Sequence, residues 1–162
     1  MHFSSFGMTI NSNAIVNAIT EHGNPVFHTS EIHLKPYLCR ESVCNLADIV
    51  AVYKQSERFY IVGIEIKEWD KRVHKKVAMD YMETYRHTCE YFYLAAKKFS
   101  RNTLELANIG LFDLTEMKVI KTPEYLYPDV DLRANIMKRI KNNFKVLANA
   151  VDDPFQRTIL EF

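Results

Sequence analysis

Residues 48–67 read DIVAVYKQSERFYIVGIEIK, and this stretch decides the fold. Residues 48–53 and 59–67 are rich in β-branched and aromatic residues, which is typical of strands. The polar residues 54–58 between them indicate a turn. The stretch therefore predicts an antiparallel hairpin with a five-residue loop.

The sequence on either side of this hairpin predicts a mixed β-sheet flanked by helices, an α/β fold of the mixed α+β kind in one domain, residues 1–162. The core spans about 12–96, and a C-terminal hairpin and helix span about 108–151. A strand, a helix and a strand in succession form a crossover unit, so the strand after the second helix should lie parallel to an earlier one. The other predicted elements are helices over Ser12–His22, about Lys71–His87 and Asp131 (as the cap) to about Ala150, and strands over Val26–Leu34, Tyr91–Ala96, Ile109–Leu114 and Met117–Lys121.

The composition excludes several classes of protein. The chain has 162 residues, 48% hydrophobic and 25% charged, with a net charge of +1. A protein that binds nucleic acid through bulk charge would be far more basic, so any such binding must use a local patch. Three cysteines are too few for a disulfide scaffold. No stretch has the length of a membrane span and the N-terminus does not resemble a signal peptide, so we expect a cytoplasmic protein, in a host cell if viral.

Three polar residues stand out within the apolar hairpin. Glu65 and Lys67 are two positions apart, so both side chains point to the same face of a strand. If Tyr53 pairs with either of the first two residues of the second strand, Asp48 falls opposite Ile64 or Glu65. The hairpin therefore brings two carboxylates and one ammonium together at one end.

Two carboxylates held close to each other repel, and burying them without partners costs free energy. A hard divalent cation removes this cost, because Mg²⁺ takes oxygen ligands from carboxylates, water and phosphate. The backbone carbonyl of Ile66 could supply another ligand. Lys67 would then orient a nucleophile or offset negative charge. This set suits the metal-assisted hydrolysis of a phosphodiester.

Asp48, sixteen intervening residues and then Glu65-Ile66-Lys67 resemble the motif of the PD-(D/E)xK nuclease superfamily. Residues 31–96 look most like the MmcB-like DNA-repair nucleases and, more loosely, the small archaeal Holliday-junction resolvases. The resemblance implies a restriction-endonuclease-like αβββαβ core and a Mg²⁺-dependent deoxyribonuclease, with Mn²⁺ as a substitute. It also implies that Asp48, Glu65 and the Ile66 carbonyl hold the metal and that Asp48, Glu65 and Lys67 are catalytic.

The sequence departs from the family pattern in two places. Leu46-Ala47-Asp48 lacks the usual proline, and residues 11–13 replace an acidic residue that many members carry near the start of the first helix. Glu31 or Glu21 could substitute as a metal ligand. Glu31 is preferred, because the most similar family members have a glutamate in a comparable strand.

A second ExK run, Glu116-Met117-Lys118, tests how specific the first one is. Only Asp113 lies near it, too close in sequence for a paired strand, and no basic helix follows. We therefore expect a solvated turn there.

Lys71, Arg72, Lys75 and Lys76 place four positive charges just after the motif and are expected to contact DNA phosphates at a helix N-terminus. Nothing in the sequence suggests base-specific readout. Trp69 is expected to pack against the sheet. The alternatives are a catalytically inactive nucleic-acid-binding protein of the same fold, a viral or structural interaction protein whose C-terminal helix forms a homodimer, and an RNase.

Overall fold

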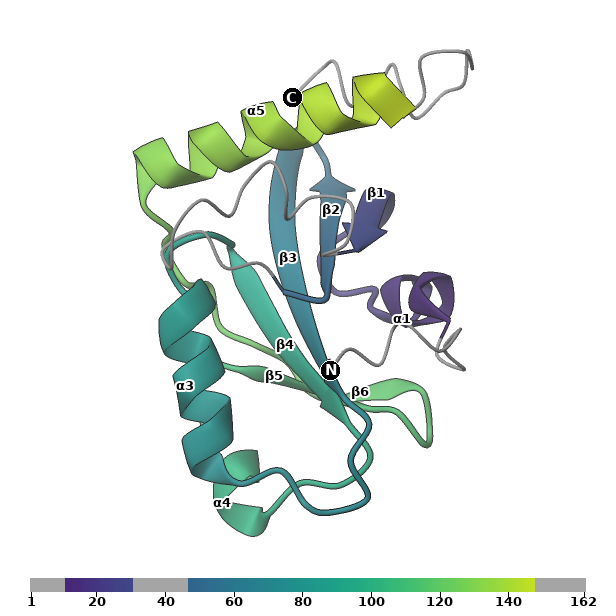
Figure 1. Ribbon diagram of the computed structural model, residues 1–162, viewed down its shortest axis with the longest axis vertical. Coiled ribbons are helices and arrows are strands. Elements are labelled where there is room, and N and C mark those ends of the chain that lie inside the picture. The colour runs from purple at the N-terminus through teal and green to yellow at the C-terminus, as the bar shows by residue number, and fades with distance from the viewer. Residues whose placement is uncertain (1–10, 31–46, 148–162) are drawn as a thin grey trace.

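The structure, a computed structural model, describes residues 11–30 and 47–147. Six strands form one mixed sheet in the order β1-β2-β3-β4-β5-β6, with helices on both faces (Figure 1). The predicted mixed α/β fold and the order of its αβββαβ core are confirmed. The elements are α1 (Ser12–Ala18), β1 (Asn24–Ser30), β2 (Ile49–Gln55), β3 (Arg58–Lys67), α3 (Lys75–Tyr85), β4 (Tyr91–Ala96), α4 (Arg101–Leu104), β5 (Gly110–Asp113), β6 (Lys118–Lys121) and α5 (Val130–Leu147).

The central hairpin pairs β2 with β3 in antiparallel orientation as predicted, and Tyr53 faces Tyr60, one of the two registers that the sequence left open. The loop is shorter than predicted, because Gln55 still pairs with Arg58. The strands therefore continue past the apolar core, and their polar ends look like a turn in the sequence. Ser56, in the two-residue loop, has a φ of 58°, a conformation that lets the chain reverse in so short a connection.

The crossover through α3 brings β4 alongside β3 in parallel, from Val62 opposite Tyr91 to Lys67 opposite Ala96. The predicted β4 has the bounds that the structure shows. β5 then pairs in parallel with β4, and β6 in antiparallel orientation with β5. The C-terminal hairpin thus extends the same sheet instead of forming a separate unit.

Alternation along the strands divides the core into two layers. Ile49, Ala51 and Tyr53 of β2 pack on the α1 face, whereas Val50 and Val52 pack on the face covered by α3 and α5. Figure 1 shows α3 beside β4 and α5 across the end of the sheet where β3 begins. Asp48 lies two residues before Val50, so its side chain belongs to the α3 face.

Each of the three predicted helices has a boundary that differs from the prediction. α1 ends at Ala18 rather than His22, because Ile19 is already extended, with φ −92° and ψ 108°. α3 begins at Lys75 rather than Lys71, because Val73 forms a bridge with Phe99 that holds its backbone extended.

The third difference concerns α5, which begins at Val130. Asp129, rather than the predicted Asp131, caps it by accepting a hydrogen bond from the Leu132 N–H at 2.8 Å. The short helix α4 was not predicted; Ser100 caps it by accepting from the Thr103 N–H. The predicted end of α5 at Ala150 lies outside the described residues.

A buried polar cluster holds the chain between α1 and β1 against the sheet. His22, 5% exposed, has its Nε2 2.6 Å from the Tyr93 hydroxyl oxygen and stacks on Tyr91 with ring centroids 3.9 Å apart. Burial lowers the pKa of His22 from 6.5 to about 4, against an opposing effect of the Glu21 carboxylate.

This pKa makes the stability depend on pH. The unfolded chain binds a proton at His22 below pH 6.5, whereas the folded chain binds it only near pH 4. The free energy of unfolding should therefore fall by about 3 kcal/mol from this residue as the pH drops from 7 to 4. Urea titrations across this range should show that His22→Gln removes this part of the loss. The exposed control His87→Gln should retain it, and equal pH curves for wild type and His22→Gln would contradict the assignment.

Candidate active site

The end of the β2–β3 hairpin brings Asp48 and Glu65 together. Ile49 pairs with Ile64, so Asp48, the residue before β2, lies opposite Glu65. Asp48 Oδ2 accepts a hydrogen bond from the Ile66 N–H at 2.8 Å, which fixes this carboxylate beside β3. The convergence predicted from strand register is present.

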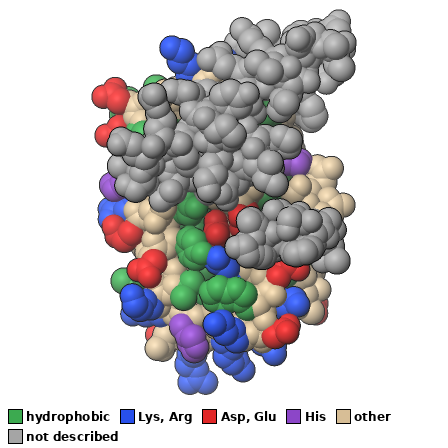
Figure 2. All heavy atoms as spheres, viewed as in Figure 1, with side chains coloured by type: hydrophobic (Ala, Val, Ile, Leu, Met, Phe, Trp, Pro, Cys, Tyr) green, Lys and Arg blue, Asp and Glu red, His purple; other side chains and the backbone are tan. Residues whose placement is uncertain are grey.

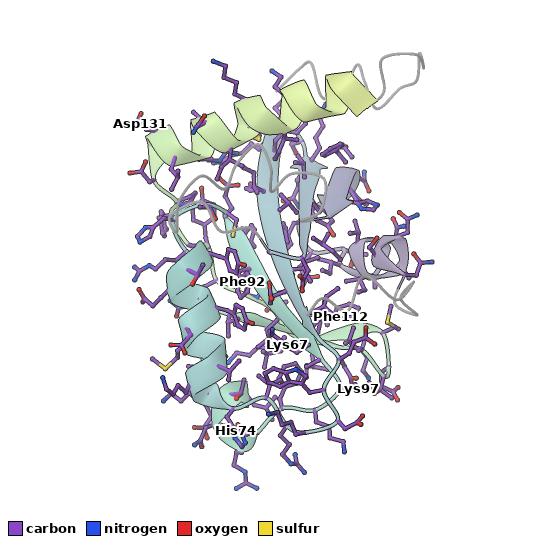
Figure 3. All side chains as sticks on the ribbon, in the orientation of Figure 1. Lys67, His74, Phe92, Lys97, Phe112 and Asp131 are labelled. Atoms are coloured by element: carbon purple, nitrogen blue, oxygen red, sulfur yellow. The ribbon has the colours of Figure 1, made fainter. Side chains whose placement is uncertain are left out.

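Lys67 completes the group on the same face. Its Nζ lies 3.6 Å from Glu65 Oε2, and both side chains are largely buried, 19% and 10% exposed respectively. In Figure 3 Lys67 lies between the end of β3 and α3. Figure 2, from the same direction, shows acidic and basic side chains next to each other near the middle of this face, among hydrophobic ones. The charged group is therefore partly desolvated but still reaches the surface.

Aromatic side chains hold Lys67 in place. Its Nζ is 4.7 Å from the ring centroid of Tyr81 and 5.3 Å from that of Trp69. The Tyr85 hydroxyl donates to Glu65 Oε1 at 3.4 Å. Trp69 packs partly buried against the core, as predicted. Its ring also contacts Lys71, whose Nζ lies 4.7 Å from the Trp69 ring centroid.

Tyr81 and Tyr85 were not among the site residues predicted from the sequence. The signal that could have identified them was available, because both are phenols four residues apart. Their rings lie parallel, within 4°, at 6.4 Å. A helix packed on the face of the sheet that carries Glu65 would direct both hydroxyls toward it.

Electrostatics keep Lys67 charged. Burial lowers its pKa, but the hydrogen bond to the Tyr81 oxygen and the negative charges of Glu65 and Asp48 more than offset this, so the pKa is raised. Burial, followed by the charges of Glu65 and Asp48, raises the pKa of Tyr81 against the opposing effect of Lys67. At neutral pH the site therefore holds an ammonium beside a neutral phenol.

The donor atoms suit a hard cation. In a strand the N–H and C=O of one residue point to the same side, so the Ile66 carbonyl points to the side from which its N–H reaches Asp48. Two carboxylates and a carbonyl are the oxygen ligands that Mg²⁺ and Mn²⁺ accept. Within residues 11–30 and 47–147 no group of three or more His, Cys, Asp or Glu side chains could hold a metal ion.

The third acidic ligand has two candidates. Glu31, the preferred one, lies outside the described residues. Glu21 acts on Tyr93 through a side-chain hydrogen bond, on the α1 face of the sheet and therefore opposite Glu65. The structure thus does not bring Glu21 into the group formed by Asp48 and Glu65.

The basic segment is only partly helical. Lys71 and Arg72 precede α3, which corrects the prediction that all four residues sit at the helix N-terminus, whereas Lys75 and Lys76 open the helix. All four are exposed. Figure 3 places His74, the N-cap, at the end of α3 beyond Lys67, and Figure 2 shows Lys and Arg side chains gathered at that end. Trp69, which contacts both Lys67 and Lys71, connects this basic end with the acidic group.

The second ExK run begins in a turn, as predicted, with Glu116 and Met117 in the turn and Lys118 as the first residue of β6. Glu116 and Lys118 are exposed, and Asp113 Oδ1 accepts from the Glu116 N–H at 3.2 Å. These residues therefore provide matched controls for Glu65 and Lys67.

Comparisons with known proteins bear on the fold alone. No protein-family model matches the chain, and no curated protein matches it. Among solved structures, it is similar to the SPO1766 protein of unknown function from Silicibacter pomeroyi, with 12% identity and a TM-score of 0.52 over 91% of this chain and 99% of that one. No described helix is long and apolar enough to cross a membrane.

The contact between Lys67 and Tyr81 makes a testable prediction. Tyr81→Phe removes the hydrogen bond that raises the pKa of Lys67, so this pKa should fall while the carboxylates remain. An NMR titration of the Lys67 side-chain carbon next to Nζ would measure the change, with Tyr125→Phe as the remote control. An unchanged Lys67 pKa in Tyr81→Phe would show that the phenol does not act on the ammonium.

Proposed function

We propose that the protein is a divalent-metal-dependent deoxyribonuclease of the PD-(D/E)xK type. The observation that carries this proposal is the convergence of Asp48, Glu65 and Lys67 on one face at the end of the hairpin. Two carboxylates brought together and partly desolvated repel each other, and a cation held between them would remove this cost.

Asp48, Glu65 and the Ile66 carbonyl would hold the metal, with Glu31 as a further candidate. When bound, Mg²⁺ or Mn²⁺ supplies Lewis-acid stabilisation of the phosphate and a more acidic water. The Ile66 N–H keeps Asp48 oriented, and the Tyr85 hydroxyl does the same for Glu65. Both carboxylates are therefore preorganised by neighbouring groups of the protein.

Lys67 places a fixed positive charge where negative charge develops on the phosphate. Glu65 and the rings of Tyr81 and Trp69 restrict its position, so little reorganisation is needed during reaction. Lys71, Arg72, Lys75 and Lys76 are proposed to contact the phosphates that flank the cleaved bond. Such contacts are independent of base sequence and weaken with salt. A DNA substrate and the small number of cysteines favour action inside the cell.

A cleavage assay tests the proposal. Linear, nicked and branched DNA, together with an RNA of the same sequence, would be incubated with Mg²⁺, with Mn²⁺ and with EDTA. The expected result is cleavage of at least one DNA with either ion and none with EDTA. The double variant Glu116→Gln/Lys118→Ala, in the exposed second ExK run, should keep the wild-type activity.

The alternatives predict different results in the same assay. Binding of DNA without cleavage under any ion would favour a catalytically inactive nucleic-acid-binding protein. Cleavage confined to RNA would favour an RNase. Neither binding nor cleavage, together with a dimer in solution, would favour a viral or structural interaction protein.

A further inference from the structure

A pocket lies at the opposite end of β3 from the candidate active site. Its volume is about 610 Å³, and its walls include Arg58, Tyr60, Tyr125, Tyr127, Val130 and Arg133. This volume falls in the range of about 300–1,000 Å³ that small-molecule sites have. Tyr60 and Glu65 are five positions apart along β3, which corresponds to about 17 Å at the rise of a strand. The pocket is therefore distinct from the candidate active site.

The pocket displays the most exposed apolar side chains of the described residues. Tyr127 is 81% exposed and Val130 79%, above every other exposed large hydrophobic residue in the ranges 11–30 and 47–147. Tyr127 also has a φ of 54°, a left-handed conformation that costs free energy in any residue with a side chain. The fold thus exposes the ring of Tyr127 to water on a strained backbone. Packing in the core does not explain this arrangement, because the ring is not buried.

Neighbouring rings support Tyr127. Its ring centroid is 4.6 Å from that of Tyr125 at an interplanar angle of 71°, and Tyr125 in turn meets Tyr91 edge-on at 5.6 Å. Both contacts have the edge-to-face geometry that aromatic pairs prefer. A planar ligand could therefore stack on a preformed aromatic surface.

The pocket contains one ion pair, between Arg133 and Glu90, and one further positive charge, that of Arg58. Arg133 pairs through Nε with the buried carboxylate of Glu90 and donates from Nη2 to the Phe59 carbonyl at 2.9 Å. Arg58 is exposed, with its guanidinium 5.7 Å from the Tyr60 ring centroid. The pocket therefore carries a net positive charge beside its aromatic wall.

We propose that this pocket binds a nucleotide unit, with the base stacked on Tyr127 and the phosphate beside Arg58. A purely apolar ligand would leave Arg58 unused, and an inorganic anion would leave Tyr127 unused. A planar ring joined to an anion uses both, and any base can stack because each has a π-face. This site does not depend on metal binding or on cleavage at Asp48.

Calorimetric titration tests the proposal. The full chain in EDTA would be titrated separately with dAMP, TMP, the two nucleosides, inorganic phosphate and a short single-stranded oligonucleotide. Saturable binding of the nucleotides is expected, with nucleosides and phosphate weaker by about fivefold or more. Tyr127→Ala and Arg58→Gln should each weaken nucleotide binding by a similar factor. Both side chains are exposed, so the fold should survive these substitutions.

Two control variants replace an exposed apolar residue and an exposed arginine that lie outside the pocket. Ile120→Ala and Arg101→Gln, exposed elsewhere on the surface, should bind as the wild type does. Equal affinity for phosphate and nucleotide, absence of saturable nucleotide binding, or unchanged affinity in Tyr127→Ala would overturn the proposal.

The titration with the oligonucleotide shows whether the bound nucleotide is free or part of a strand. Tighter binding of the oligonucleotide than of dAMP, lost in Tyr127→Ala, would identify a nucleotide within a strand. Binding of mononucleotides alone would identify a free nucleotide. The titrations are made in EDTA and measure binding alone, so failure of the proposed nuclease activity would leave this result unaffected.

Discussion

Replacing Glu65 with Gln is expected to reduce divalent-ion-dependent DNA cleavage by about a thousandfold or more. The amide has the shape of the carboxylate and can still accept from the Tyr85 hydroxyl, but it has no negative charge for a cation. Asp48→Asn should have a similar effect, and if the two carboxylates hold one ion as proposed, the double variant should be little worse than either. Initial rates of cleavage with Mg²⁺ would measure these losses.

The controls separate chemistry from folding. Glu116→Gln, prepared in parallel, should cleave like the wild type, whereas the loss of cleavage in Glu65→Gln and Asp48→Asn prepared in the same way would exclude a contaminating nuclease. The thermal midpoint of Glu65→Gln should not fall, because neutralising Glu65 removes a partly desolvated charge. A Glu65→Gln protein that keeps even a tenth of the wild-type rate would contradict the assignment of this residue.

Replacing Arg133 with Ala is expected to lower the free energy of unfolding by about 3 kcal/mol. Arg133 pairs with Glu90, a side chain only 2% exposed, and joins α5 to the first residues of β3 through the Phe59 carbonyl. Its loss leaves a buried carboxylate without its cation. Urea denaturation at pH 7 would measure the change.

The pH dependence of this loss gives a second readout. Burial raises the pKa of Glu90, and Arg133 and the Ile61 N–H oppose this. Without Arg133 the pKa should rise further, so the destabilisation should be smaller at pH 5, where more of Glu90 is protonated. Arg86→Ala, which breaks an exposed pair with Glu83, should cost under about 1 kcal/mol. A similarly small loss in Arg133→Ala would show that the buried pair does not stabilise α5 against the sheet.

The sequence predicts the hairpin and its register because the information is local. Alternation of apolar side chains predicts which face each strand residue occupies, but it left two partners open for Tyr53, and the structure selects Tyr60. With Tyr53 opposite Tyr60, counting along the strands places Asp48 opposite Glu65. The predicted loop is too long because Lys54 and Gln55 are polar, although backbone pairing continues through them.

Features that depend on distant parts of the chain were not predicted. α3 begins later than predicted because the backbone of Val73 is held extended. Its N–H donates to the Lys98 carbonyl and its carbonyl accepts from the Ser100 N–H, and both partners follow β4 in the sequence. The hydroxyls of Tyr81 and Tyr85 belong to the site only because the crossover lays α3 on the face that carries Glu65. Periodicity shows that such residues face the sheet, but not which polar group each one meets.

The buried polar pairs were not predicted from the sequence for the same reason. His22 meets Tyr93 across 71 positions, and Glu90 meets Arg133 across 43. Each pair joins elements whose proximity is set by the order of strands in the sheet. Neither partner has a local pattern that identifies the other.

Paramagnetic broadening by Mn²⁺ tests most directly whether a cation binds between the two carboxylates. In an NMR titration of the wild type, the account predicts that the backbone amide signals of Asp48, Glu65 and Ile66 broaden at the lowest Mn²⁺ concentrations. Asp48→Asn should require much higher concentrations for the same effect. Broadening that begins elsewhere, or that is identical in Asp48→Asn, would contradict the account.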